Sequence, residues 1–398
     1  MCSSQANASL LNIIRQADNF PNFHTAYPER HPINGKRIEP IGVVPAQLMN
    51  EIKGEKGLQM FSIVKKLSEK EKAEKRKIDE KRREKKAASD DIEEASSDLK
   101  DVSVDDKEKG KSKGKKKEDY KIVILAIFFS DEVNARGVEG RFEVMARLVE
   151  GWRDQKKFGY ALKKWTGEKI SVYASAYSAI WQKDKELKAA ARKPFGNVVL
   201  EIERSAAPIF GFTVPNVHLI AHQGEGGDVR IWVQKHVDID KDGQSREKFN
   251  TSVTLSGAVP AGKTPFEAAV TAAHEDAGWT EDFTKAHMKN TGMVSLFQIA
   301  KWGGLVPGCD YVYDLRLPSE DSIGYQVPKS SDESTTFQSL SISEVFAALN
   351  KNEFRPTSAA VMVDFLIRHG HITPENEPNY AKIIRRLHRR TGIAGPGH

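Results

Sequence analysis

The sequence of 398 residues has only two cysteines and no long apolar run, and both absences limit what the protein can be. Cys2 and Cys309 lie far apart in unrelated contexts, so they support neither a disulfide framework nor a thiolate metal site. No apolar stretch approaches the roughly 18 residues that a membrane-spanning helix needs. The N-terminus also lacks the apolar run of a signal peptide. We therefore expect a soluble cytoplasmic protein without a membrane partner, with the nucleus as the alternative location.

Aliphatic residues are nearly missing from residues 63–119, which contain EKEKAEKRKIDEKRREKK and KGKSKGKKKED. Such a segment cannot bury enough apolar area to offset its chain entropy, so we expect a charged low-complexity insertion that is largely disordered. The net charge of the chain is +6, and this insertion carries about half of it. Because the rest of the chain is close to charge balance, nucleic acid is not an expected partner. The oligomeric state does not follow from the sequence.

The remaining sequence divides into four segments by composition and periodicity. Residues 1–62 contain five prolines and predict an irregular N-terminal extension. Residues 120–205 predict an α/β domain, with a strand in IVILAIFF and a helix in RFEVMARLVEGWRD. Residues 206–390 alternate short strand patterns with one central helix and close with three helical patterns, and 391–398 form a tail. Strands on both sides of a central helix predict an α+β sandwich.

The central helix lies in the stretch SGAVPAGKTPFEAAVTAAHEDAGW, Ser256 to Trp279. Thr264, Pro265 and Glu267 predict its start, with an N-cap, a proline at the first helical position and a capping-box glutamate. Its predicted core stripe consists of Phe266, Ala269, Val270, Ala273 and Ala277. Ala272, Glu275 and Asp276 share a neighbouring face. Two carboxylates on one face beside a glycine-containing loop are typical of a site for Mg²⁺ or Mn²⁺ held between protein and substrate phosphates.

The spacing of this stretch resembles the Nudix box, G-x5-E-x7-R-E-U-x-E-E-x-G-U, where U is aliphatic. Gly257 and Gly278 match its first and last glycines, and Glu275 and Asp276 match its paired acids. Lys263, Thr271, Ala272 and Trp279 depart from it, and Ala272 removes one metal-directed carboxylate. Flanking segments such as NEFRPTSAAVMVDFLIRHGHITPENEPNY resemble fungal Nudix proteins related to the N-terminal part of thiamine pyrophosphokinase fusions. The resemblance covers most of residues 10–60 and 120–390. No kinase domain follows here, so no kinase activity is expected.

This resemblance implies a Nudix αβα sandwich over residues 206–390, with the α/β extension and the charged insertion before it. It implies metal-dependent hydrolysis of a diphosphate small molecule that resembles thiamine diphosphate, a nucleoside diphosphate or an 8-oxo-guanosine diphosphate. Glu275 and Asp276 are the implied metal ligands for Mg²⁺ or Mn²⁺. A later loop of the family carries a further acid, and Glu333 in SDESTTF is the candidate for it.

Two other functions remain open. Ala272 favours a Nudix-shaped module that binds a diphosphate ligand without cleaving it. The basic segments 111–117 and 385–390 favour a protein that binds polyanions. Arg204 could contact substrate phosphate or pair with a neighbouring glutamate, and Trp232 could stack on a ligand or pack in the core. The histidines, including His218, His222, His369 and His371, show no zinc-ligand spacing with cysteine and are expected to be surface or packed residues.

Overall fold

The computed structural model describes residues 4–18, 42, 44, 52, 56, 58–66, 120–181, 185–236, 251–330, 332 and 334–397. The chain separates into two compact units, one made of Met1–Gly57 with Ser130–His398 and the other of Leu58–Phe129. In the second unit, β1 (Leu58–Lys66) pairs antiparallel with β2 (Tyr120–Phe129). The strand expected in IVILAIFF is therefore present, and β1 runs past the boundary at residue 62 that composition indicates. Residues 67–119, including the basic run 111–117, lie outside the described residues.

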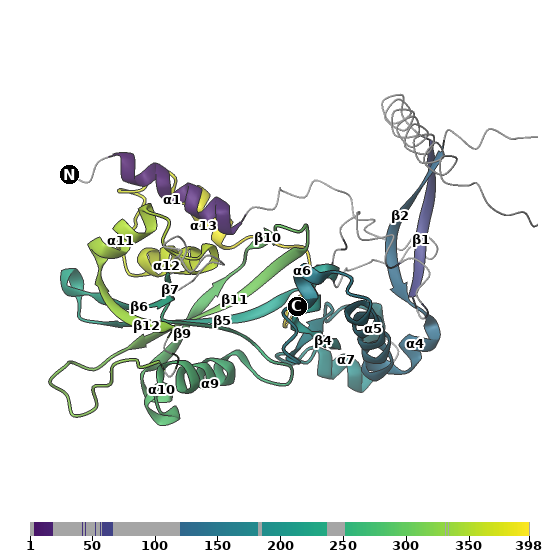
Figure 1. Ribbon diagram of the computed structural model, residues 1–398, viewed down its shortest axis with the longest axis horizontal. Coiled ribbons are helices and arrows are strands. Elements are labelled where there is room, and N and C mark those ends of the chain that lie inside the picture. The colour runs from purple at the N-terminus through teal and green to yellow at the C-terminus, as the bar shows by residue number, and fades with distance from the viewer. Residues whose placement is uncertain are drawn as a thin grey trace, which may run out of the picture. The chain divides into compact units, whose positions relative to one another are not determined.

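The first unit contains a mixed sheet of eight strands between two layers of helices (Figure 1). The strands are β5 (Val214–Gln223), β6 (Arg230–His236), β7 (Thr251–Val253), β8 (Leu255–Ala258), β9 (Met288–Val294), β10 (Phe297–Ile299), β11 (Leu305–Arg316) and β12 (Thr335–Ser341). The main order is β10-β11-β5-β6-β12, with β7 beside β6, β8 beside β5 and β9 beside β11. The central strands β5 and β11 run parallel, whereas the other pairs are antiparallel.

Helices cover both faces of this sheet (Figure 1). One face carries α9 (Pro265–Ala277) and α10 (Glu281–His287). The other carries α1 (Ser4–Ala17), α11 (Ile342–Asn350), α12 (Pro356–Arg368) and α13 (Tyr380–Leu387). The predicted α+β class and the αβα sandwich are confirmed by this arrangement. The three C-terminal helices that the sequence predicts are present as α11, α12 and α13.

Successive side chains of β5 and β11 enter opposite halves of the core, because strand residues alternate between the two faces of a sheet. Leu219, Ala221, Tyr313 and Leu315 pack in the cluster that contains the α9 residues. Ile220 and Val312 pack instead in the cluster that contains α12. On these two strands, odd-numbered residues therefore face α9 and even-numbered residues face α12.

Helix α9 begins where the sequence predicts it. The Thr264 hydroxyl accepts a hydrogen bond from the Glu267 backbone N–H, and the Glu267 carboxylate accepts one from the Thr264 N–H at 2.8 Å. The helix ends at Gly278, which has a φ of 68° and therefore the left-handed conformation that glycine tolerates best. The prediction for Phe266 is wrong, since its side chain is 39% exposed. Pro265 and Ala268 are buried at this end of the helix, so they cover the core and leave Phe266 at its rim.

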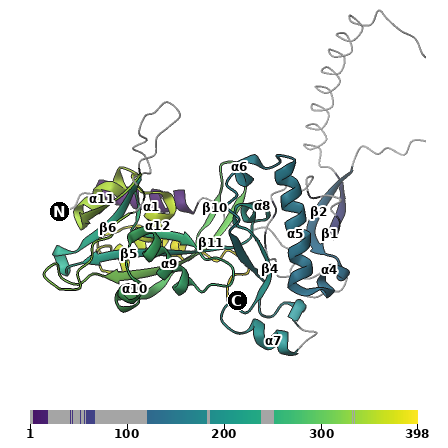
Figure 2. The same cartoon turned by 60° about the horizontal axis from the view of Figure 1, so that its bottom comes forward.

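A smaller α/β part precedes the main sheet in the same unit (Figure 2). Its strands β3 (Lys169–Tyr173) and β4 (Val198–Glu203) pair antiparallel, and β4 packs with α5 (Gly137–Asp154), the helix predicted in RFEVMARLVEGWRD, whose buried face includes Met145, Leu148 and Trp152. Its short helices are α4 (Asp131–Ala135), α6 (Gly159–Leu162), α7 (Lys185–Ala191), α8 (Ala207–Phe210) and the 3-10 turns η2 (Ala179–Trp181) and η3 (Arg204–Ala206), whereas the 3-10 turn η4 (Gly226–Asp228) connects β5 and β6 of the main sheet. Hydrogen bonds from Ala261 N to Lys169 O and from Asn197 Nδ2 to Gly395 O link this part to the main sheet region.

The expectation of an irregular N-terminal extension is wrong for its first residues, because Ser4–Ala17 form the helix α1. Leu10, Leu11 and Ile14 of this helix are buried in the α12 half of the core. Asp18, directly after the helix, is 2% exposed and accepts hydrogen bonds from Arg386 and Arg389, each at 2.8 Å. Packing against the C-terminal helices therefore stabilises this segment as a helix. The prolines that led us to expect irregular structure lie further along the chain. Within the described residues, no helix is both long and apolar enough to cross a membrane.

Candidate functional site

The C-terminal half of α9 places Glu275 and Asp276 side by side at the surface, as the sequence predicts. Both residues are exposed, and Ala272, one turn earlier, is half-buried. Within the described residues, neither carboxylate has a hydrogen bond or an ion pair. Partial burial and the charge of Glu275 both raise the pKa of Asp276. Two adjacent carboxylates without a cationic partner among the described residues form a place where a divalent cation would be stabilised.

Lys263 and Thr271, which stand where the Nudix box has a glutamate and an arginine, still contact each other. Lys263 Nζ donates a hydrogen bond to Thr271 Oγ1 at 3.2 Å, and Thr271 Oγ1 donates to Glu267 O at 2.9 Å. The loop before α9 therefore stays connected to the helix although both members of the family's ion pair are replaced. The double replacement leaves no isolated buried charge, since both residues lie at the exposed side of the helix.

The chain returns to the end of α9 in the segment before β12. The Lys329 N–H donates to Ala277 O at 2.9 Å, and the indole Nε1 of Trp279 donates to Gln326 O at 3.2 Å. These bonds fix residues 326–329 against the end of the helix that carries the two acids. Glu333, the third predicted acid, lies outside the described residues, so its position stays a prediction. The neighbouring Asp332 carboxylate accepts hydrogen bonds from Ser334 and Thr335, so both of its oxygens already have partners within the loop.

Gly257 lies on β8, opposite Val217 of β5, and leaves open space on its side of the strand. A Cβ atom added at this position would meet no atom within 4 Å. The glycine is therefore not required by packing within the described residues. Gly278, which matches the last glycine of the box, is the left-handed residue after α9.

The two tentative substrate contacts have structural partners. Arg204 forms an ion pair with Glu168 at 2.6 Å, rather than with Glu201 or Glu203 as the sequence suggests. Trp232 is half-buried and packs against the α9 half of the core, although its buried Nε1 has no hydrogen-bond partner. Among the described residues, no contact joins Arg204 or Trp232 to Glu275. Their roles toward a substrate therefore stay predictions.

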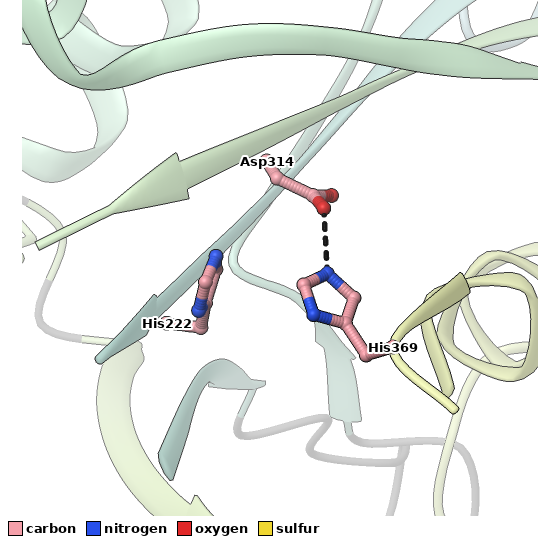
Figure 3. Close-up of side chains that lie close together, drawn as sticks. All are labelled: His222, Asp314 and His369. Carbon is pink, nitrogen blue, oxygen red and sulfur yellow. Dashed lines mark hydrogen bonds and ion pairs between the residues drawn. The ribbon is translucent and has the colours of Figure 1, made fainter. Parts of the chain in front are cut away.

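A second cluster, which the sequence analysis missed, lies on the opposite face of the sheet. Figure 3 shows His222 of β5, Asp314 of β11 and His369, the residue after α12, side by side. One ligand atom from each of the three side chains lies within 4.8 Å of the others. His369 Nε2 is 2.9 Å from Asp314 Oδ2. Spacing along the chain could not reveal this cluster because its members come from three separate elements, but the even numbers of His222 and Asp314 place both on the α12 face.

The surroundings of this cluster hold Asp314 ionised and His222 neutral. Arg368 donates to both oxygens of Asp314, at 2.7 and 3.0 Å, and also to Asp364 at 2.8 Å. Although burial opposes ionisation, the hydrogen bonds from His369 and Arg368 lower the pKa of Asp314. Burial lowers the pKa of His222 to about 4, and the positive charges of Arg316 and Arg368 act in the same direction. A cavity of about 260 Å³ opens here, lined by His222, Gly224, Glu225, Gly226, Val229, Arg316, His369 and His371.

Comparison with known proteins shows similarity to Nudix hydrolases over about half of the chain. No family model matches the sequence. An uncharacterised protein of Saccharomyces cerevisiae is 33% identical over 227 residues, which cover 53% of this chain and 61% of that protein. Nudix hydrolase 24 of Arabidopsis thaliana, a chloroplastic protein, is 28% identical over 47% of this chain and 48% of its own length. Nudix hydrolase 20 of the same plant, also chloroplastic, is 28% identical over 48% of this chain and 49% of its own length. The chain thus spans about half to three fifths of the length of the relatives that it matches.

Proposed function

We propose that the chain, which is similar to Nudix hydrolases over about half of its length, hydrolyses a diphosphate-containing small molecule with Mg²⁺ or Mn²⁺ at the end of α9. The observation that supports this most is the pair Glu275 and Asp276, exposed on one helix and without a cationic partner among the described residues. Partial burial and the charge of Glu275 raise the pKa of Asp276, and a bound divalent ion would act against both effects by stabilising the carboxylate. The open side of Gly257 fits the close approach of a ligand to the strand.

Each residue has a distinct role in this proposal. Glu275 and Asp276 would hold the metal ion, which supplies charge neutralisation for the diphosphate and for the attacking water. Glu333 is the candidate for a further ligand or a general base, because the segment that precedes it is bonded to the end of α9. Gly278 and the capping box position the helix end. A thiamine-diphosphate-like or nucleoside-diphosphate-like compound is the substrate class that we propose.

The proposal does not need the carboxylate that Ala272 lacks. Mg²⁺ commonly keeps several waters and takes only one or two protein carboxylates together with substrate phosphates. Two ligands on adjacent positions of α9 therefore meet its requirement. Asp276 is one methylene shorter than the family's glutamate, and a misplacement of about 1 Å can cost on the order of 100-fold in rate. We accordingly expect slow turnover.

A phosphate-release screen tests the proposal. The full chain would be incubated with thiamine diphosphate, oxidised thiamine diphosphate, nucleoside diphosphates and 8-oxo-guanosine diphosphate, each with Mg²⁺, with Mn²⁺ and with excess chelator. We expect phosphate release from at least one compound, and its loss with chelator. Equal release with and without metal, or none from the whole panel, would contradict the proposal.

The half-buried Ala272 favours a second candidate, a module that binds a diphosphate ligand without cleaving it. Thermal unfolding of the same samples separates the two functions. A rise in melting temperature with a ligand that is not cleaved supports the binding module, since a ligand stabilises the state that it binds. Binding of polyanions through the terminal helix has less support, because Arg386 and Arg389 are engaged by the buried Asp18.

A further inference from the structure

We propose that His222, Asp314 and His369 form a binding site for a transition-metal ion of the Zn²⁺ class, separate from the acids of α9. The site lies on the α12 face of the sheet, because His222 and Asp314 have the same strand parity as Ile220 and Val312. The α9 helix packs against the other face. The two sites are therefore separated by the sheet itself, and neither shares a residue with the other.

The three side chains have the geometry of a ligand set. Their nearest ligand atoms all lie within 4.8 Å of one another, and His369 Nε2 and Asp314 Oδ2 are 2.9 Å apart. Zn²⁺ binds imidazole nitrogen and carboxylate oxygen at about 2.0 to 2.2 Å, so two ligands of one tetrahedral ion are about 3.3 to 3.6 Å apart. His369 Nε2 and Asp314 Oδ2 would separate by roughly half an ångström to admit an ion, which would replace the hydrogen bond between them. His222 would be the third ligand.

The donor types decide which ions the site would take. Two imidazoles and one carboxylate suit Zn²⁺, Co²⁺, Ni²⁺ or Fe²⁺, whereas Mg²⁺ prefers a shell made of oxygen. The site would therefore discriminate against Mg²⁺, one of the two ions proposed for Glu275 and Asp276.

An unsatisfied nitrogen gives independent support. His222 is 8% exposed, and its Nδ1 is buried without a hydrogen-bond partner. A buried polar atom without a partner costs about 1 to 3 kcal/mol and calls for an explanation such as a water or an ion. A metal ion or a water in the adjoining cavity would give the His222 ring a polar partner.

The groups around the three ligands orient them. Arg368 holds both oxygens of Asp314 and is itself held by Asp364. The ring of Phe365 stacks on His369 with centroids 3.9 Å apart, and it forms a T-shaped pair with His222 with centroids 5.4 Å apart. Outer groups of this kind fix ligand orientation in metal sites. With neutral histidines, Asp314, Asp364 and Arg368 sum to one negative charge, and the nearby Arg316 is paired with Glu225. This balance favours a cation over an anion.

A cavity adjoins two of the three proposed ligands, His222 and His369. Its volume of about 260 Å³ leaves room for water or a small ligand beside His222 and His369. Three protein ligands with an open fourth position distinguish sites that exchange or activate ligands from closed structural zinc sites. His371 also lines the cavity but is not one of the three clustered ligands, so it provides a matched control.

Cobalt binding tests the proposal without reference to enzymatic activity. The full chain, made without a histidine tag and stripped with chelator, would be titrated with Co²⁺ in excess Mg²⁺ and followed by visible absorption, then by Zn²⁺ competition. We expect one Co²⁺ per chain, displaced by Zn²⁺. His369→Asn and His222→Asn should each weaken binding at least about 10-fold. His371→Asn and Glu275→Gln should leave it unchanged.

Three results would overturn the site. They are absence of Co²⁺ absorption in the wild type, displacement by Mg²⁺, and undiminished binding by His369→Asn. His369 has a side chain that is 29% exposed, so its replacement by asparagine is the variant least disruptive to folding. Circular dichroism of each variant would establish that lost binding does not reflect lost fold. Since Glu275→Gln leaves this readout unchanged, failure of the proposed hydrolase activity and failure of this site are distinguishable.

Discussion

At the scale of single residues, His222 links stability to pH. Its pKa falls from 6.5 to about 4 on folding because the ring is buried. Between these values the unfolded chain binds a proton that the folded protein does not, so stability is complete above about pH 6.5 and decreases as the pH falls toward 4. In metal-free protein, the free energy of unfolding measured with urea should fall by about 2 kcal/mol more between pH 7 and pH 5 than in His222→Asn. Equal pH dependence of the two proteins would show that His222 is not buried as described.

Ala272 is the residue at which the box loses a carboxylate, and restoring one should strengthen the site. Ala272→Glu adds a third acid to the helix face that carries Glu275 and Asp276, so it should raise metal affinity and metal-dependent phosphate release by on the order of 10-fold. Rates measured against Mg²⁺ concentration would show a lower half-saturating concentration. An unchanged Mg²⁺ dependence would mean that this face does not hold the metal.

At the scale of elements, the N-terminal cap of α9 contributes to the free energy of unfolding. Thr264→Ala removes both the hydroxyl that accepts from Glu267 N and a partner of the Glu267 carboxylate. We expect a loss of about 1 kcal/mol in the free energy of unfolding, measured by urea titration. Thr271→Ala, on the same helix but outside the cap, should cost less. A larger effect at Thr271 would contradict the assigned start of the helix.

Elements set by local chemistry could be predicted from the sequence, and elements set by distant contacts could not. The start of α9 follows from Thr264, Pro265 and Glu267, and its capping hydrogen bonds join residues only three positions apart. The helix α1 depends on α12 and on Arg386 and Arg389, hundreds of residues away, so prolines nearby in sequence misled the prediction. The same limit hid the cluster at His222, since no local pattern connects β5, β11 and the end of α12. Glu275 and Asp276 were found because both lie in one helix.

At the scale of the whole molecule, Asp18 joins the two ends of the described chain. It is 2% exposed and binds Arg386 and Arg389 beside the core that α1, α12 and α13 share. Asp18→Asn would remove the buried carboxylate that accepts from Arg386 and Arg389 and should cost about 3 kcal/mol in the free energy of unfolding. Asp282→Asn, at an exposed position of α10, is the matched control and should change stability little. Similar values for the two variants would show that the N-terminal helix does not depend on this contact.

The central claim is that Glu275 and Asp276 at the end of α9 serve metal-dependent hydrolysis of a diphosphate. The most direct measurement compares initial rates of phosphate release by the wild type, Glu275→Gln and Glu281→Gln at one Mg²⁺ concentration, with the most active compound of the screen. Glu281 is an exposed glutamate on the next helix that pairs only with Lys285 among the described residues, so its replacement controls for lost surface charge. We expect Glu281→Gln to match the wild type and Glu275→Gln to be slower by on the order of 100-fold. Equal rates for all three proteins would contradict the claim.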